Sequence, residues 1–303
     1  MTLVSTSAFY ERVGLDMTTL RKRAETLQGQ ISSGERVNRS SDDPVAAARL
    51  RELARSEAIS EVNVANANRA LSDLTLADSA LQEIAENVIR AQELATQASS
   101  DTLSPAQRAS IGEQIANIRE NLIALANSRD SAGHALFGGE GVGAAYTVSA
   151  GVPGYAGTAS SGELALGDGQ SVTRGVTGPE VFEFTYGGAP TDLFAVLGTL
   201  ADALKGGSAD PAAAARGSLN ALSAGLETIT TTETVVGARM NWVDLNISRH
   251  ERQQEMRTTE QTEVGKVDPA KAITELQEIM TVLEASQASF VQLSNLSLFD
   301  MMR

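Results

Sequence analysis

The segment from Val45 to Ser99 constrains the fold most, because it contains neither glycine nor proline over its whole length. Small and aliphatic side chains recur in it every three or four residues, the spacing that places them on one face of an α-helix. These positions are Ala67, Ala70, Leu74, Ala77, Leu81, Ile84, Val88, Ala91, Ala95 and Ala98. An unbroken helix over this segment would be on the order of 80 Å long at 1.5 Å per residue. Since such a rod cannot bury its apolar face alone, the sequence predicts further helices packed against it.

Segments with the same spacing lie on both sides of this one along the chain. They span Phe9–Ile31, Ile111–Leu125, Leu222–Ile247 and Ile273–Phe290. In the third, the apolar positions are Leu222, Leu226, Ile229, Val236, Met240, Val243 and Ile247, with Glu233 as a polar interruption, and the pattern fades after His250. The sequence therefore predicts a mainly α fold, a long antiparallel helical bundle or coiled coil formed by both chain ends.

The middle of the chain has a different composition. Residues 138–190 hold 14 of the 26 glycines and six charged residues, with short runs such as "AYTVSA" and "EVFEFTY". Glycine-rich turns between short runs of this kind are typical of β-hairpins, so we expect a small inserted β-rich domain. Helix should resume in "TDLFAVLGTLADAL", with Thr191 as its N-cap.

Two adjacent carboxylates in "SSDDPVAAARL", Asp42 and Asp43, raise the question of a catalytic or metal-binding pair. Pro44 argues for a helix start instead, because proline suits the first helical position and aspartate suits the cap before it. Three other places show the same pattern. The predicted caps with their prolines are Asp43 and Pro44, Ser104 and Pro105, Asp210 and Pro211, and Asp268 and Pro269.

No motif predicts a catalytic, cofactor or metal site. The chain has no cysteine, which excludes disulfides and thiolate chemistry. "GGEGVGAAY" lacks the strand and acidic residue of a dinucleotide loop, and "GTASSG" lacks the strand and helix around a hydrolase serine. His134 and His250 do not have helical zinc-ligand spacing, and we expect each to be exposed or capping. We predict no enzyme activity.

Charge and hydropathy argue against some classes of binding partner. The net charge of −14 disfavours nonspecific attraction to nucleic acid or anionic membranes. No apolar run approaches the roughly 18 residues that a spanning helix needs, and no cleavable signal peptide is expected at the N-terminus.

Both chain ends carry more apolar surface than a soluble monomer usually exposes, so we expect them to bind other subunits. The predicted assembly interface is Phe9, Val13, Met17, Leu20, Leu27, Ile31, Ile273, Leu276, Met280, Leu283, Phe290, Leu293, Leu296, Leu298 and Phe299. The expected divisions are an N-terminal assembly helix (1–40), two halves of a helical rod (41–137 and 191–267), the β-rich insertion (138–190) and a C-terminal assembly helix (268–303).

Several motifs resemble the flagellin superfamily. The segment "LQGQISSGERVNRSSDDPVAAAR" of this chain resembles the superfamily's N-terminal signature, and the resemblance continues in residues 66–100 and 126–139. The C-terminal part resembles "VGARMNWVDL" and residues 272–303. Within the superfamily, Pro44, "ALFGG" and "LSLFD" resemble the family of hook-associated proteins at the hook–filament junction, as do residues 154–184. Ala135 departs from the pattern, because an aromatic residue is often found there.

This resemblance implies a structural protein of the bacterial flagellum, exported through the flagellar type III apparatus. It implies an extracellular location at the hook–filament junction and a role in filament attachment and motility. The implied partners are copies of itself in a ring-like layer, another hook-associated protein on the hook side, flagellin on the filament side and an export chaperone. No cofactor is implied.

Three alternatives stay open at this stage. The chain could be filament flagellin itself, an unrelated secreted coiled-coil adhesin or effector, or an enzyme with its site in residues 138–190.

Overall fold

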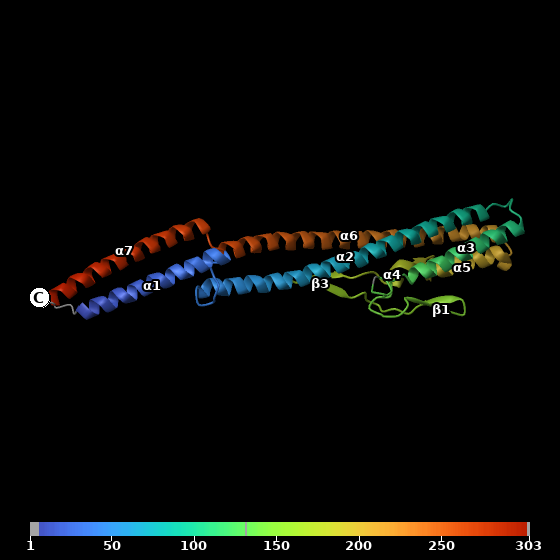
Figure 1. Cartoon of the computed structure of the whole chain (residues 1–303). Helices are drawn as coiled ribbons and strands as arrows, with labels where there is room; N and C mark the ends of the chain where they lie inside the picture. The colour runs from blue at the N-terminus through green and yellow to red at the C-terminus, as the bar shows by residue number, and fades with distance from the viewer. Residues whose placement is uncertain (1–5, 131, 302–303) are drawn as a thin grey trace. The chain divides into compact units, whose positions relative to one another are not determined.

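The computed structural model describes residues 6–130 and 132–301 (Figure 1). Most of these residues are helical, which confirms the predicted mainly α class. The helices are α1 (Thr6–Ser33), α2 (Pro44–Ala98), α3 (Pro105–Ala126), α4 (Gly178–Phe182), α5 (Leu193–Asp202), α6 (Pro211–Gly265) and α7 (Pro269–Met301), with one π-helical turn, η1 (Ala203–Gly207).

The four predicted caps begin four of these helices. At each, a side-chain oxygen of the cap accepts a hydrogen bond from an amide of the first turn at 2.9–3.3 Å. The caps are Asp43, Ser104, Asp210 and Asp268, and their prolines Pro44, Pro105, Pro211 and Pro269 take the first helical position.

The inserted segment forms three separate antiparallel hairpins, which confirms the expected β-rich region. They pair β1 (Tyr146–Ser149) with β2 (Val152–Tyr155), β3 (Glu163–Gly167) with β4 (Gln170–Thr173), and β5 (Glu183–Tyr186) with β6 (Ala189–Asp192). Each hairpin turns through two residues with positive φ, the requirement of a type I′ turn. Two of these turns are Asp-Gly and Gly-Gly, but the first is Ala150-Gly151.

The boundary between the insertion and the following helix differs from the prediction. Thr191 lies in β6 opposite Phe184 and does not cap α5. Asp192 is the cap, and its Oδ1 accepts from Ala195 N at 2.8 Å. Strand pairing extends one residue further than the sequence pattern indicated, and the next oxygen-bearing side chain takes the cap position.

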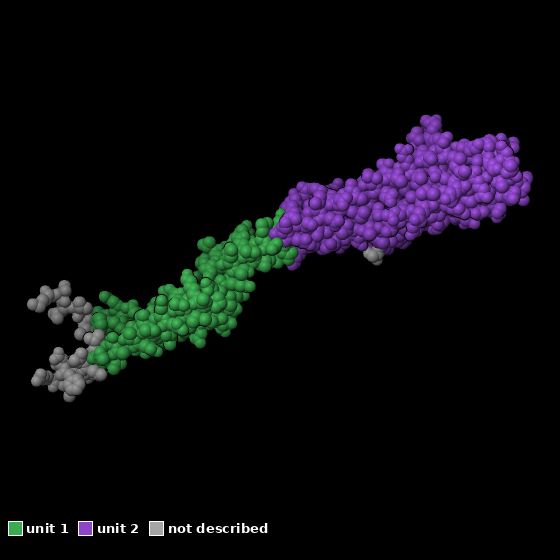
Figure 2. All heavy atoms as spheres, turned by 90° about the horizontal axis from the view of Figure 1, so that it is seen from above, with its two compact units in different colours: residues 1–59, 253–303 green, residues 60–252 purple. Residues whose placement is uncertain are grey.

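The described chain divides into two compact units, coloured separately in Figure 2. Unit 1 comprises residues 1–59 and 253–303, and unit 2 comprises residues 60–252. The divisions fall within α2 and α6, at other places than the five predicted segments. The β-hairpins are part of unit 2, because their apolar side chains share its core with the helices.

The core of unit 2 combines helical seams with a cluster of aromatic rings. Phe182 stacks on Phe194 with ring centroids 4.7 Å apart, and the edge of Tyr146 approaches both. All three side chains are at most 5% exposed. This cluster joins β1 to α4 and α5, so it fixes the insertion on the helices.

The seam of α6 differs in part from the predicted one. Leu222, Ile229, Val236 and Val243 are fully buried, as the spacing requires. Thr232, rather than the predicted interruption Glu233, fills the polar gap in the buried row, and its hydroxyl bonds the carbonyl of Glu180.

The buried row of α6 also continues through Asn246 to His250. His250 is 3% exposed, so the expectation of an exposed or capping histidine is wrong. Its Nε2 lies 2.6 Å from the carbonyl oxygen of Leu166 and its Nδ1 3.3 Å from Ser60 Oγ, and these two partners compensate the burial of a polar ring.

Candidate assembly surface

Unit 1 is built on a pair of antiparallel helices, α1 and α7 (Figure 1). Their shared core is small: Ala24 and Leu27 of α1 against Ala272 and Ile279 of α7. Towards the chain ends the pair continues through an edge-to-face contact between Tyr10 and Phe290, with centroids 5.4 Å apart. Two helices bury only one stripe each, so any wider apolar surface stays in solvent.

The structure places the predicted interface residues in three environments. Leu27 and Leu283 are buried, and Val13, Met17, Leu20, Ile31, Leu276 and Phe290 are half-buried. Phe9, Ile273 and Met280 are 42–44% exposed. Leu293, Leu296, Leu298 and Phe299 lie outside the residues whose side chains the structure describes.

The sequence pattern mixed two faces of α7. The row that meets α1 is Ala272, Leu276, Ile279 and Leu283, with steps of four, three and four. Ile273 and Met280 also fit a spacing of three or four from Leu276, but they point outward. Ile279 was missed because Met280, its neighbour, satisfied the same pattern. Counting Ala272 as an apolar position would have favoured the correct row.

Further apolar side chains are exposed along the pair. Val282 is 50% exposed and Val291 57%. One side of the pair has a hollow of about 340 Å³, which is lined by Phe9, Val13, Val282, Ala285, Ser286, Ser289 and Phe290. Five of the seven lining residues are apolar and two are serines, a mainly apolar lining of the kind found where another protein covers a surface.

The Asp42–Asp43 pair has a structural explanation. Asp43 Oδ2 accepts from Arg36 at 3.0 Å, and Arg36 also donates to the carbonyl of Val264 at 2.8 Å. Asp42 Oδ2 instead accepts from the amide of Arg39 at 2.8 Å. Hydrogen bonds from the Ala46 amide and the Arg36 side chain lower the pKa of Asp43. The two carboxylates serve different local bonds, so they do not form a joint acid–base site.

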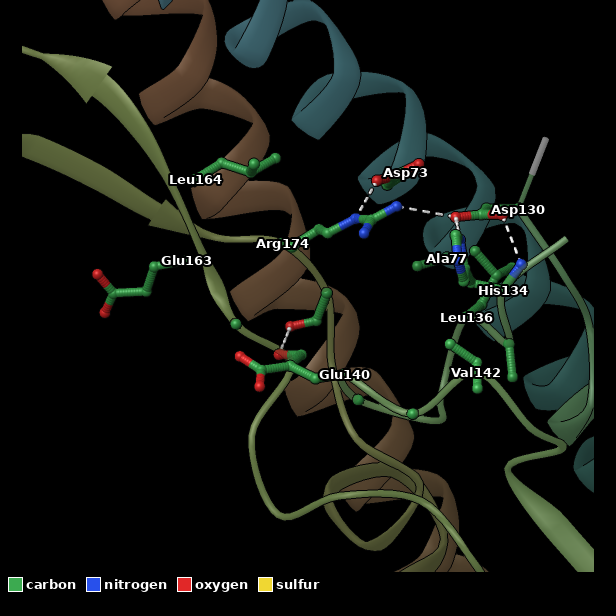
Figure 3. A pocket seen from close by; sticks show the side chains of 16 residues that line it. Asp73, Ala77, Asp130, His134, Leu136, Glu140, Val142, Glu163, Leu164 and Arg174 are labelled. Carbon is green, nitrogen blue, oxygen red and sulfur yellow. Dashed lines mark hydrogen bonds and ion pairs between the residues drawn. The ribbon is translucent and has the colours of Figure 1, made fainter. Parts of the chain in front are cut away.

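A pocket in unit 2 contains Arg174, which joins two carboxylates (Figure 3). Its Nε donates to Asp73 at 2.7 Å and its Nη2 to Asp130 at 2.9 Å. Burial would raise the pKa of Asp130, but the amides of His134 and Ala132 and the charges of His134 and Arg174 outweigh it, so the pKa is lowered.

This cluster connects three parts of unit 2. Asp73 comes from α2, Asp130 from the loop after α3, and Arg174 follows β4. His134 Nδ1 lies 3.4 Å from Asp130 Oδ2. Among the described residues, no group of three or more histidine and carboxylate side chains is placed to hold a metal ion. The cluster is an internal ion-pair network that secures the third and fourth strands to the helices.

The remaining sequence candidates also have local partners. Ser161 of "GTASSG" donates to the carbonyl of Gly175 at 2.9 Å. The amide of Glu140, in the glycine-rich stretch, donates to Thr158 at 2.7 Å. In the described part of the chain, no helix is long and apolar enough to cross a membrane.

Comparison with known proteins assigns the family. The model of the bacterial flagellin N-terminal helical region matches residues 4–141. Flagellar hook-associated protein 3 of Escherichia coli (strain K12) is 28% identical over 314 residues, which cover 98% of each chain. The protein of the same name in Salmonella typhimurium (strain LT2) is 30% identical over 211 residues, 67% of this chain and 66% of that one.

A solved structure has the same fold. The flagellar junction protein FlgL of Legionella pneumophila superposes with a TM-score of 0.60 at 14% identity, over 72% of this chain and 99% of that one. Sequence and fold therefore agree, and the chain belongs to the flagellin superfamily of flagellar structural proteins and resembles its hook-associated members of the FlgL type.

Proposed function

We propose that this protein forms the layer of subunits that joins the flagellar hook to the filament. The observation that carries the proposal is the correspondence with a hook-associated protein 3 over 98% of both chains, which includes the inserted hairpins as well as the helical ends. The partners are copies of the chain, another hook-associated protein beneath the layer, and flagellin above it.

The same proposal places the protein outside the cell, after export through the flagellar type III apparatus with the help of an export chaperone. The motifs at both chain ends that resemble the junction family support this placement. No enzyme activity is proposed, because the polar clusters of the described chain are internally bonded networks.

The assembly surface we propose is unit 1. Its helices carry exposed apolar residues on the sides that α1 and α7 do not cover for each other. Fully burying an exposed large apolar side chain is worth roughly 1.5–3 kcal/mol. The side chains here are about half exposed, so each contributes part of that value and several per subunit favour association.

Deleting the gene, imaging the cells and assaying the medium for monomeric flagellin tests this function. We expect hooks without filaments, with flagellin released into the medium. Bare hooks with no flagellin outside would make this chain the filament subunit instead. Normal filaments would contradict both roles and favour a secreted adhesin or effector.

A further inference from the structure

Two connections between helices meet within unit 1, and together we call them the elbow. Residues 34–43 join α1 to α2, and residues 266–268 join α6 to α7. The two connections pair as an antiparallel bridge between Glu35 and Lys266, flanked by backbone hydrogen bonds of 2.7 and 3.1 Å. Both links between the α1–α7 pair and the parts of α2 and α6 in unit 1 therefore pass through one place.

The backbone of the elbow offers little resistance to bending by itself. It rests on one bridged residue pair, whereas a stable strand pair needs a longer ladder and packing against other elements. Gly34, which begins the first connection, has a φ of +73°, and in the described chain no atom beyond its neighbours lies within 4 Å of where a Cβ would stand. Because glycine adopts many backbone conformations, other contacts must fix the direction of the α1–α7 pair.

The side chain of Arg36 supplies such contacts. Its Nη1 donates to Oδ2 of Asp43, the cap of α2, at 3.0 Å. Its Nη2 and Nε donate to the carbonyl of Val264, in the last turn of α6, at 2.8 and 3.1 Å. The carbonyl of Arg36 accepts from Gln30 Nε2 of α1 at 2.6 Å. One residue thus bonds α1, α2 and α6, and the rigid fork of its guanidinium holds the acceptors in fixed directions.

Electrostatics favour a cation at this position. The last four carbonyls of a helix have no intrahelical donor, and that end of the helix carries a partial negative charge. The carboxylate of Asp43 is a second negative group beside it. The side chains of Arg36 and Asp43 are 42% and 34% exposed, however, and ion pairs with that much exposure add little to stability. The bonds of Arg36 therefore determine direction more than they determine stability.

We propose that Arg36 is the positioning residue of the elbow. It fixes the direction in which the α1–α7 pair leaves α2 and α6, so that every copy presents its terminal pair in the same orientation. A repeating layer requires this, because each contact between copies must recur with the same geometry. The effect of Arg36 on assembly rests on the proposed function, whereas its effect on the direction of the pair does not.

Distances between two spin labels test the direction, since the chain has no cysteine of its own. Thr26→Cys on α1 and Ala54→Cys on α2 place one label on each side of the elbow, at exposed positions of unit 1. The purified full-length chain is labelled and diluted with unlabelled chain, and pulsed electron paramagnetic resonance gives the distribution of separations. We expect Arg36→Met to broaden this distribution without changing the helical circular dichroism, because the helices persist while their direction is lost.

A further substitution isolates the bond between Arg36 and Asp43. Asp43→Asn keeps the oxygen that caps α2, since asparagine is an equally good cap, but it replaces the acceptor of Arg36 by an amide nitrogen. It should broaden the distribution less than Arg36→Met, because Val264 still accepts. The double variant should match Arg36→Met, since both changes remove one shared contact. Asp42→Asn, the same change at the neighbouring carboxylate, is the control and should leave the distribution unchanged.

The opposite results would overturn the assignment. A distribution as narrow in Arg36→Met as in the labelled parent would mean that the backbone alone fixes the elbow. Broadening together with a loss of helical circular dichroism would mean that Arg36 holds the helices together rather than sets their direction. A double variant broader than Arg36→Met would mean that Asp43 acts through another partner.

Swimming tests the consequence for assembly. Arg36→Met should impair swimming, and Arg39→Met, which removes an exposed arginine of the same connection, should not. Full swimming by Arg36→Met despite a broadened distribution would refute the role in assembly and leave the junction role intact, since the deletion phenotype decides that role. A deletion strain with normal filaments would overturn the junction role alone, and the label distances would still test the elbow.

Discussion

The two units use the same kind of long helix but bury very different amounts of apolar surface. Among the described residues, the main core cluster of unit 1 has four buried members, whereas that of unit 2 has 35. Unit 2 surrounds its helices with α3, α5 and the hairpins, but unit 1 has pairs of helices only. Unit 2 therefore has a large core of its own, whereas the core of unit 1 is small, as the proposed assembly through unit 1 requires.

Charge separates the units in the same way. In sequence, unit 1 has 13 Lys and Arg against 16 Asp and Glu, a net charge of −3, and unit 2 has 11 against 22, a net charge of −11. Like-charged copies repel through unit 2 far more than through unit 1. Unit 1, which is nearly neutral and exposes apolar side chains, is thus the better surface for self-association, and the acidic unit 2 is suited to face water.

Assembly should be lost when a charge enters the seam of unit 1. Leu283 is 8% exposed, and Leu283→Asp places a carboxylate where α7 meets α1. An unpaired buried charge costs several kcal/mol, so the helices should separate and swimming should be abolished. Fluorescence of Trp242, the only tryptophan and a residue of unit 2, should show an unchanged unfolding transition.

Thr274→Asp, at an exposed position of the same helix with no predicted interface residue three or four positions away, is the matched control and should swim normally. Swimming by the Leu283→Asp variant would contradict the assignment of unit 1 as the assembly surface.

Matched leucine truncations compare the two cores directly. Leu81 of unit 2 is fully buried, and Leu81→Ala should lower the free energy of unfolding by about 2–5 kcal/mol, seen in urea as a shift of the Trp242 transition. Leu27→Ala in unit 1 should leave that transition in place. Only the unfolding of unit 1 should shift to lower urea. It appears as a loss of helical circular dichroism that precedes the Trp242 transition, because small units with few buried contacts open first.

Equal shifts of the Trp242 transition in both variants would show that the units unfold together. That result would contradict the inference that unit 2 folds independently of unit 1.

Local signals explain which parts of this architecture were predictable. The helix starts follow from the cap and proline at each one, and the hairpins from glycine-rich turns, since both are determined within a few residues. Long helices without glycine or proline are similarly visible. Their existence did not depend on which neighbours they meet.

Which of two adjacent apolar residues is buried was not predictable, because the position of the neighbouring helix determines it. Ile279 and Met280 both fit the helical spacing, and the position of α1 selects Ile279. His250 gave no sequence signal of burial, since its partners Ser60 and Leu166 lie 190 and 84 residues away. The Arg174 network likewise joins Asp73 and Asp130 from distant segments. Such long-range pairs require the fold itself.

The Arg174 network should make the stability of unit 2 depend on pH. Arg174→Met leaves Asp73 and Asp130 as buried carboxylates without their cation, which we expect to cost about 2 kcal/mol at pH 7 after allowance for the partial exposure of Arg174. Because the pKa of Asp130 is lowered in the fold, its contribution is complete above the ordinary aspartate pKa and is lost as the pH falls through the lowered value.

The measured penalty of Arg174→Met should accordingly shrink from pH 7 towards pH 3, when followed by Trp242 fluorescence in urea. Arg90→Met, which removes an exposed pair with Glu93, is the control and should change stability little at any pH. A penalty independent of pH would mean that Arg174 stabilises unit 2 by packing rather than by charge.

The smallest effect expected concerns two tyrosines in the first hairpin of unit 2. The hydroxyl of Tyr146 is buried and has no hydrogen-bond partner among the described residues, whereas Tyr155 donates to the carbonyl of Thr158 at 2.7 Å. Removing an unpaired buried hydroxyl relieves a desolvation cost, so Tyr146→Phe should be neutral or stabilise by up to about 1 kcal/mol. Tyr155→Phe should destabilise by about 0.5–1 kcal/mol, since it deletes a bond that is made. Urea unfolding of both variants, followed by Trp242 fluorescence, distinguishes these signs. A clear decrease in the free energy of unfolding of Tyr146→Phe would show that the hydroxyl is hydrogen-bonded in solution. The aromatic cluster of unit 2 would then be stabilised by a polar contact as well as by ring packing.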